Sequence, residues 1–258
     1  MIARQTRRNS FAVGFHSTPM ARLGDIGVRV ATLSKTLGDP PRTAKGAVAM
    51  ILRGIRGPVE VLLIERAERE GDPWSGQIAF PGGRRARTDR TLLDTARRET
   101  KEEVGLSLAR DAKLLGWLPW RAPANRVDWI VVPYVFTLRR SAQPKPTPEV
   151  ARAFWARVDA LPATLHKAIL EFPDGDLEAP AFDVGGGKPL WGFTFRVLCD
   201  FFDLVGWPAA GSPERRASTK PRAAGPGQRG RGYSDTASRS RRPGKGGTRP
   251  SRGRALRS

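Results

Sequence analysis

Short apolar runs separated by turn-forming residues occupy the central part of the chain. Residues 46–52 (GAVAMIL) and 59–66 (VEVLLIER) are rich in aliphatic and β-branched side chains, and the turn-rich RGIRGP separates them. This pattern predicts two adjacent strands. A third apolar run, 78–80, ends at Pro81-Gly82-Gly83, and runs within 113–120 and 128–138 predict further strands.

The segment 91–105 (TLLDTARRETKEEVG) instead has the periodicity of an amphipathic helix. Thr91 is suited to the N-cap position, with Asp94 three positions later, and small or apolar residues recur on one stripe. Gly105 is suited to end the helix. A mixed segment follows at 149–162, and a second amphipathic stretch at 190–205. Strand runs interrupted by helices predict one layered α+β domain.

Composition narrows the possible classes of protein. The chain has one cysteine, Cys199, and two histidines, so an intramolecular disulfide and a Cys/His zinc site are excluded. No apolar run approaches the length of a membrane span, and we expect no membrane partner. A cytoplasmic location is expected, or an organellar matrix if the Arg-rich start is a presequence; Met20 is an alternative start.

The positive charge lies at the two ends of the chain. Lys and Arg number 45 against 25 Asp and Glu, yet residues 47–211 contain 23 basic and 21 acidic side chains. We expect a partly disordered N-terminal extension at 1–42, a domain at 43–209 and a basic disordered tail at 210–258. The tail is either a solvated extension or a nonspecific contact with nucleic acid or another anionic surface.

Three glutamates crowd one side of the predicted helix, although the chain is basic. At about 100° per residue, Glu99, Glu102 and Glu103 fall within an arc of roughly 100° and repel one another. Either Arg98 and Lys101 or divalent cations balance them. The preceding glycine corner and basic loop suit a phosphate ester, and oxygen ligands favour Mg²⁺ or Mn²⁺.

The stretch RETKEEVGL at 98–106 resembles the second half of the Nudix box, G-x5-E-x7-R-E-U-x-E-E-x-G-U, where U is aliphatic. Thr100 replaces the first U, Asp89 stands at the first glutamate, and the stretch from Asp89 to Arg98 is one residue longer than usual. The resemblance implies a Nudix-type α/β/α sandwich with a mixed sheet and the box as loop-helix-loop. It also implies hydrolysis of a nucleoside diphosphate derivative with Mg²⁺ or Mn²⁺.

The same resemblance implies roles for individual residues. Glu99, Glu102 and Glu103 would be the metal ligands and carry catalysis, with Glu99 or a carboxylate elsewhere as the base for water. Arg98 would brace the loop by pairing with Asp89 or a box glutamate. The residues implied for substrate contact and loop shape are Arg66, Gly82 and Gly83.

Features around the box resemble the coenzyme A pyrophosphatase branch of the family. The FPGGR motif at 80–84 and the residues Leu62, Leu63, Arg66, Ala67 and Gly76 fit its upstream pattern. Ile64 and Gly71 depart from that pattern, and one extra residue precedes Gly76. The leading expectation is cleavage of coenzyme A or an acyl-CoA to 4′-phosphopantetheine and adenosine 3′,5′-bisphosphate. The alternatives are a hydrolase of nucleotide sugars, dinucleotides or oxidised nucleotides, and a nucleic-acid-binding protein acting through its tail.

Overall fold

The computed structural model describes residues 3–4, 22–54, 57–70, 74–124, 126–172 and 175–207. Contacts within the chain separate residues 1–215 from residues 216–258. The predicted basic tail, its contact with nucleic acid and the two alternative start positions lie outside the described residues. The domain boundaries predicted at 43 and 209 stay predictions.

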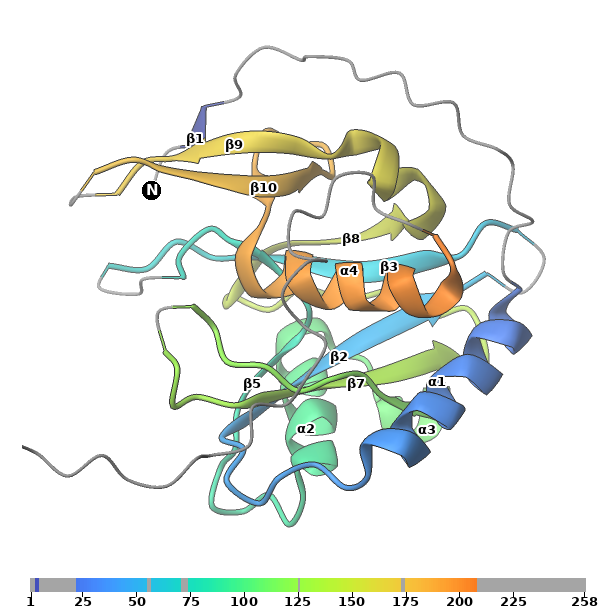
Figure 1. Cartoon of the computed structure of the whole chain (residues 1–258). Helices are drawn as coiled ribbons and strands as arrows, with labels where there is room; N and C mark the ends of the chain where they lie inside the picture. Colours follow the sequence, from blue (N-terminus) through green and yellow to red (C-terminus); the bar gives the residue numbers. More distant parts are fainter. Residues whose placement is uncertain are drawn as a thin grey trace, which may run out of the picture. The chain divides into compact units, whose positions relative to one another are not determined.

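A mixed β-sheet forms the middle of the domain (Figure 1). Its strands run in the order β4-β3-β2-β7-β6, with β5 also paired to β2 and β8 to β3. The β2–β7 pair is parallel, and the other pairs are antiparallel. The bounds are β2 Gly46–Arg53, β3 Glu60–Arg66, β4 Ile78–Ala79, β5 Gly82–Arg84, β6 Ala112–Trp117, β7 Val131–Leu138 and β8 Val150–Arg157.

Both faces of this sheet are covered, because alternate residues of a strand point to opposite sides. Met50 and Leu52 of β2 belong to a core shared with helices α1 (Leu23–Leu37) and α4 (Gly192–Val205). Ala49 and Ile51 belong to a second core with helices α2 (Leu92–Val104) and α3 (Leu108–Asp111). Figure 1 shows α1 and α4 in front of the sheet and α2 behind it. The predicted α+β sandwich is confirmed.

Helix α2 has the ends that its sequence predicts. The Thr91 hydroxyl accepts a hydrogen bond from the Asp94 backbone N–H, and the Asp94 carboxylate accepts one from the Thr91 N–H, so the capping box is complete. Gly105 follows the last turn with φ 69°, a left-handed conformation that glycine adopts without steric cost. The apolar stripe of the helix packs on β2.

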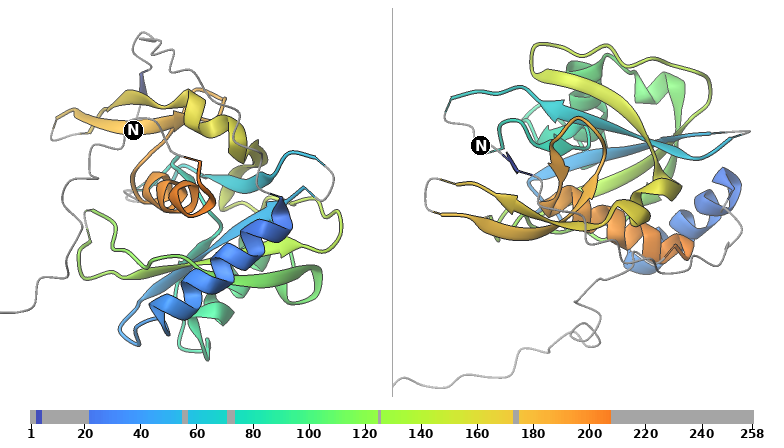
Figure 2. Two further views of the ribbon diagram at one scale, coloured as in Figure 1. Left: turned by 45° about the vertical axis from the view of Figure 1, so that its right-hand side comes forward. Right: turned by 90° about the horizontal axis from the view of Figure 1, so that it is seen from above.

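One helix and one β-hairpin of the structure were not predicted from the sequence. Helix α1 lies within the segment 1–42 that was expected to be a partly disordered extension, yet Ile26 and Val30 are buried in the core. The hairpin of β9 (His166–Leu170) and β10 (Leu177–Asp183) forms a second sheet with β1 (Ala3–Arg4) and β11 (Pro189–Leu190). Figures 1 and 2 show the hairpin beside α4, and the 3₁₀ helix η1 (Val158–Thr164) leads into it.

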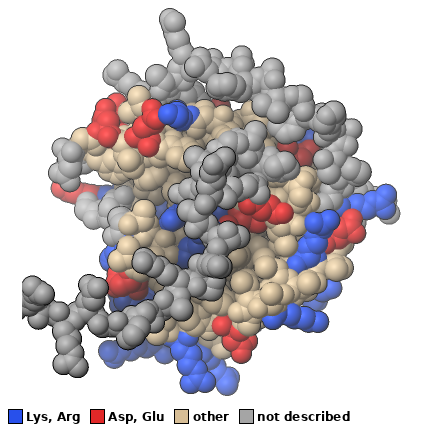
Figure 3. Space-filling view, in the orientation of Figure 1, with Lys and Arg blue, Asp and Glu red and all other residues tan. Residues whose placement is uncertain are grey.

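Charges on the described surface are mixed in sign. Figure 3 shows Lys and Arg interspersed with Asp and Glu on the face in view, which agrees with the nearly balanced charge of residues 47–211. Of the helices within the described ranges, none combines the length and hydropathy needed to cross a membrane.

Candidate active site at the glutamate face of helix α2

A glycine loop packs directly against the carboxylates of α2. The Gly82 N–H donates a hydrogen bond of 2.8 Å to Oε2 of Glu103. A Cβ atom on Gly83 would lie 2.7 Å from the carboxylate carbon of Glu99, closer than real Cβ contacts occur. Glycine at position 83 therefore leaves room for the Glu99 carboxylate against the backbone of β5, and a larger residue would have to push that carboxylate aside.

Glu103 is a buried acid with few charged neighbours. Its residue exposure is 3%, and burial raises its pKa to about 8 despite the hydrogen bond from Gly82. The guanidinium of Arg66 lies 4.0 Å from Oε1, at the limit of an ion pair. Glu99 has a side-chain exposure of 16%, and burial raises its pKa as well. The region around these two acids thus favours a compensating positive charge.

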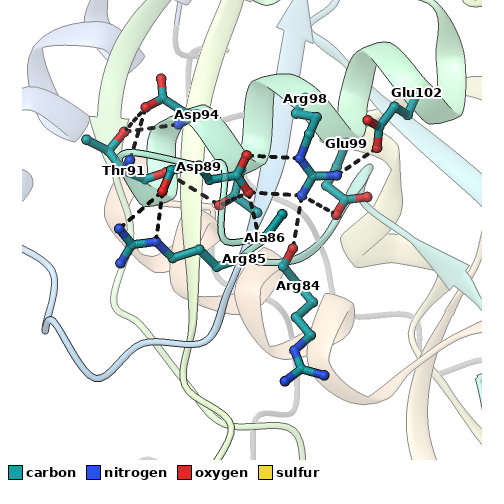
Figure 4. Close-up of polar contacts among 10 residues, drawn as sticks. Arg84, Arg85, Ala86, Asp89, Thr91, Asp94, Arg98, Glu99 and Glu102 are labelled. Atoms are coloured by element: carbon teal, nitrogen blue, oxygen red, sulfur yellow. Dashed lines mark hydrogen bonds and ion pairs between the residues drawn. The ribbon is translucent and has the colours of Figure 1, made fainter. Parts of the chain in front are cut away.

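Arg98 connects the loop before α2 with the helix (Figure 4). Its Nε and Nη2 atoms each donate to the Asp89 carboxylate over 3.0 Å, and Nη2 also donates to the Arg84 carbonyl over 3.0 Å. The same guanidinium contacts Glu99 at 2.8 Å and Glu102 at 2.7 Å. Arg98 therefore pairs both with Asp89 and with two box glutamates, and its role as a brace for the loop stays a prediction.

The three box glutamates do not gather into one cluster. Glu99 and Glu103 are four residues apart and point to nearly the same side, whereas Glu102 is about 100° around the helix from Glu103. The Glu102 side chain is 53% exposed, and its carboxylate forms an ion pair with Arg98 at 2.7 Å. Across the described residues, no group of three His, Cys, Asp or Glu side chains is close enough to hold a metal ion. The ligand role of Glu102 stays a prediction.

The charges of the site do not balance. Asp89, Glu99, Glu102 and Glu103 are linked by ion pairs to two guanidinium groups, those of Arg98 and Arg66. With every group ionised, these four acids would carry two more charges than the two guanidinium groups, and burial opposes the ionisation of Glu103 when no further cation is bound. Oxygen donors with a net charge of this size are the environment that a hard divalent cation prefers.

An aromatic and arginine cluster lies beside the glycine loop, and sequence reasoning missed it. The Arg126 guanidinium is 4.9 Å from the ring centroid of Trp129 and 5.5 Å from that of Trp74. Arg84 lies 5.3 Å from the Trp129 ring. The members come from three separate segments, so no local spacing in the sequence signals the cluster.

This fold holds an acidic helix against a glycine loop, the arrangement expected of a Nudix-type hydrolase. The model of the NUDIX domain matches residues 43–173. The chain belongs to the Nudix family, and the resemblance seen in the sequence is confirmed.

Several known proteins are similar to parts of the chain. Human mitochondrial coenzyme A diphosphatase NUDT8 is 36% identical over 88 residues, which are 34% of this chain and 37% of that protein. Peroxisomal coenzyme A diphosphatase 1 of Saccharomyces cerevisiae is 29% identical over 106 residues, covering 41% and 27%. A MutT/nudix family protein from Enterococcus faecalis is 19% identical, covers 73% and 71%, and has a TM-score of 0.41. The matches span 16% to 37% of the length of the curated relatives.

Proposed function

We propose that the chain hydrolyses the diphosphate linkage of a nucleoside diphosphate derivative with a divalent metal ion, and that coenzyme A or an acyl-CoA is the substrate. The products would be 4′-phosphopantetheine, or its acyl form, and adenosine 3′,5′-bisphosphate. One observation carries the proposal: the carboxyl groups of Glu99 and Glu103 both lie against a glycine loop, Glu99 in an ion pair with Arg98 and Glu103 with Arg66 only at 4.0 Å.

The residues present fit a divalent ion by their chemistry. Glu99 and Glu103 offer oxygen donors only, and Mg²⁺ is commonly held by one or two carboxylates together with substrate phosphates and waters. Two carboxylates that face the same loop therefore suffice to bind the ion. Glu102 would become a third ligand if its ion pair with Arg98 opened. The bound ion would neutralise the diphosphate and acidify a water molecule.

Side chains and backbone of the protein would bind the diphosphate and accept the proton of the attacking water. Arg66 lies 4.0 Å from Glu103 and would donate to a phosphate oxygen of the substrate. The backbone of Gly82 and Gly83 shapes the loop against which the diphosphate lies. Arg98 holds Oε1 of Glu99, and we assign Oε2 of Glu99 as the atom that accepts the proton of the attacking water. The water oxygen bonds to one phosphorus, the bridging P–O bond breaks, and the bridging oxygen leaves with the other phosphate.

Support for coenzyme A comes from two sources. The FPGGR motif and the upstream residues resemble the coenzyme A branch, and relatives from human and yeast are named coenzyme A diphosphatases. Nucleotide sugars, dinucleotides and oxidised nucleotides share the same linkage, because fold alone does not select a substrate. They are the competing outcomes of the test.

A panel assay tests this function. The full chain is incubated with coenzyme A, ADP-ribose, a diadenosine polyphosphate and 8-oxo-dGTP, each with Mg²⁺ or Mn²⁺, and products are identified by mass spectrometry. We expect the highest kcat/KM with coenzyme A, and no turnover of any substrate after a chelator has removed the metal ion. A higher kcat/KM with another diphosphate would replace coenzyme A as the substrate, and no turnover of any member would overturn the proposal.

The matched variants are Glu103→Gln and Glu178→Gln. Glu103→Gln keeps the shape and an acceptor for the Gly82 N–H but removes the charge, so metal-dependent turnover should fall at least 100-fold (roughly, for a group acting on a metal ion). Glu178 is exposed on β10 and paired with Lys167, so its variant should keep wild-type turnover. The melting temperature in Mn²⁺ gives an independent readout, because only the first variant should lose the metal-induced rise.

A further inference from the structure

The loop between β6 and β7 holds a half-buried arginine between two tryptophans. Arg126 lies over Trp129 at 4.9 Å and Trp74 at 5.5 Å, and Arg84 lies over Trp129 at 5.3 Å. Both indoles and Arg126 are partly accessible, and Arg84 is exposed. The mechanism proposed above uses none of these four side chains. Two indoles and two guanidinium groups at one partly open place are the components of a nucleotide-binding surface.

The cluster is built on a supported loop. The Arg126 N–H donates to the Pro123 carbonyl over 3.0 Å, and the Trp129 N–H donates to the Arg126 carbonyl over 2.9 Å, so two successive turns set the spacing of the two side chains. At the base of the loop, Arg121 forms a two-pronged ion pair with Asp200 of α4. The Arg196 guanidinium donates to the carbonyl of the neighbouring Ala122 over 2.9 Å. The loop is therefore held by α4.

A single residue step separates this cluster from the glutamate face. Gly83 abuts Glu99, and the next residue is Arg84, whose Cα is about 3.8 Å further along the chain. Figure 4 shows the Arg84 carbonyl turned toward Arg98 and its guanidinium pointing away from the carboxylates. Gly46 pairs with Arg84 in the sheet, and a Cβ atom on Gly46 would lie 3.3 Å from Nε1 of Trp129. The glutamate face and the indole therefore adjoin the same short strand, β5, from its two sides.

The stacked arrangement leaves the hydrogen-bonding edge of each arginine usable. Cation–π stacking uses the flat face of a guanidinium, whose N–H groups point outward in its own plane. That edge donates well to phosphate. Asp128 is on the same loop, and its carboxylate is paired with Lys45 at 2.8 Å, which limits its repulsion of an anion.

We infer that Trp129 and Trp74 stack on the base of the substrate's nucleoside half, and that Arg126 and Arg84 bind a phosphate on its ribose. This inference rests on the proposed diphosphatase activity and concerns which nucleoside the enzyme prefers. The cluster favours a nucleoside bearing a phosphate besides the diphosphate over a nucleoside without one. Trp129 and Arg126 are the two residues that decide this selectivity.

Binding of the product halves to the full chain tests the inference. Isothermal titration calorimetry without metal measures adenosine 3′,5′-bisphosphate, 5′-AMP and 4′-phosphopantetheine. We expect the bisphosphate to bind at least tenfold (about one charge-assisted contact) more tightly than AMP, and phosphopantetheine to bind more weakly than both. Equal affinity for the bisphosphate and AMP would overturn the inference.

Single substitutions distinguish base stacking by Trp129 from phosphate binding by Arg126. Trp129→Ala should weaken both nucleotides by roughly 5- to 100-fold, the range for loss of one stacked base, and Trp129→Phe should restore most of it. Arg126→Gln should remove the preference for the bisphosphate while AMP binding changes little. The control is Arg139→Gln, an exposed arginine just beyond the other end of β7, about 25 Å away along the strand.

Two outcomes separate this inference from the function on which it rests. If Trp129→Ala and Arg126→Gln lower only the melting temperature, with wild-type KM for coenzyme A and wild-type nucleotide affinities, the stack is structural and the inference falls while the hydrolase stands. If the wild-type chain binds the bisphosphate selectively but hydrolyses no diphosphate, the proposed function fails and the binding surface stands. We expect a higher KM with little change in kcat for both variants.

Discussion

Replacing Asp89 with asparagine tests the brace that positions the loop before α2. Asp89 is 7% exposed and accepts four hydrogen bonds: two from Arg98, one from the Ala86 N–H at 2.8 Å and one from the Thr95 hydroxyl at 3.0 Å. Asparagine has nearly the same shape, so Asp89→Asn removes charge and one acceptor without opening a cavity.

The contacts set the size of the effect. An asparagine oxygen at the Oδ2 position keeps three hydrogen bonds, from Arg98 Nη2, Ala86 and Thr95, but its amide group then faces the Nε–H of Arg98, donor against donor. Losing one hydrogen bond to a charged group costs about 1.5–3 kcal/mol. Removing one partner of a buried ion pair costs about 3–5 kcal/mol when the other charge is left alone. Arg98 keeps Glu99 and Glu102, so we expect about 2–3 kcal/mol.

The pH dependence has a definite sign. Hydrogen bonds from Arg98, and then from the Ala86 N–H and Thr95, lower the pKa of Asp89 from 3.8 to about 2. A lowered folded-state pKa means that the stabilisation is complete above pH 3.8 and is lost as the pH falls toward 2. Asparagine does not titrate. The difference between wild type and variant should therefore be constant from neutral pH down to about pH 5 and should narrow below pH 4.

Urea denaturation of both proteins at several pH values measures this difference. The control is Asp94→Asn: Asp94 has a side-chain exposure of 39%, and an asparagine oxygen can keep its capping bonds to Thr91, so the cost should stay below about 1 kcal/mol. A difference for Asp89→Asn below about 0.5 kcal/mol at pH 7, or one that does not change down to pH 3, would show that the Asp89 charge does not hold Arg98 and the loop.

Three further substitutions probe the same region. Gly83→Ala should weaken Mn²⁺ binding at least tenfold (roughly, for displacement of a ligand by a close contact) by pushing Glu99 aside, as calorimetry would show; wild-type affinity would contradict the close approach. Gly105→Ala should cost about 1 kcal/mol in urea, because φ is 69° there, and no loss would mean that the helix end is not left-handed in solution. Thr91→Ala should cost about 1 kcal/mol through its lost cap to Asp94, measured by the same denaturation, and an unchanged midpoint would argue against the cap.

Local sequence signals predicted the parts of the fold that local physics determines. The capping box of Thr91 and Asp94 and the terminal Gly105 marked the limits of α2, because caps depend on neighbours a few residues away. The strands of the central sheet were visible as apolar runs. Helix α1 was missed because the Arg-rich residues before it suggested an extension, and β9 and β10 because the acidic, turn-rich residues between them resemble a loop.

In the candidate site, too, local sequence predicted the helix face, whereas tertiary packing determined the contacts. The sequence brought Glu99, Glu102 and Glu103 to one side of a helix, but only packing decides which of them face the loop. Glu103 became buried against Gly82, and Glu102 stayed with Arg98. Trp129 is only three residues from Arg126, but Trp74 is about 50 residues away in the chain, so its proximity depends on the whole fold.

The central claim is that the face formed by Glu99 and Glu103 directs water to a diphosphate with the help of a divalent cation. Mass spectrometry of the products formed from coenzyme A in ¹⁸O-labelled water with Mg²⁺ or Mn²⁺ tests it most directly. We expect 4′-phosphopantetheine and adenosine 3′,5′-bisphosphate, one of them carrying a single ¹⁸O atom, with no products after chelation and at least a roughly 100-fold slower reaction with Glu103→Gln. Product formation that is equally fast in that variant, or independent of the metal, would mean that Glu103 and a divalent cation do not carry the reaction.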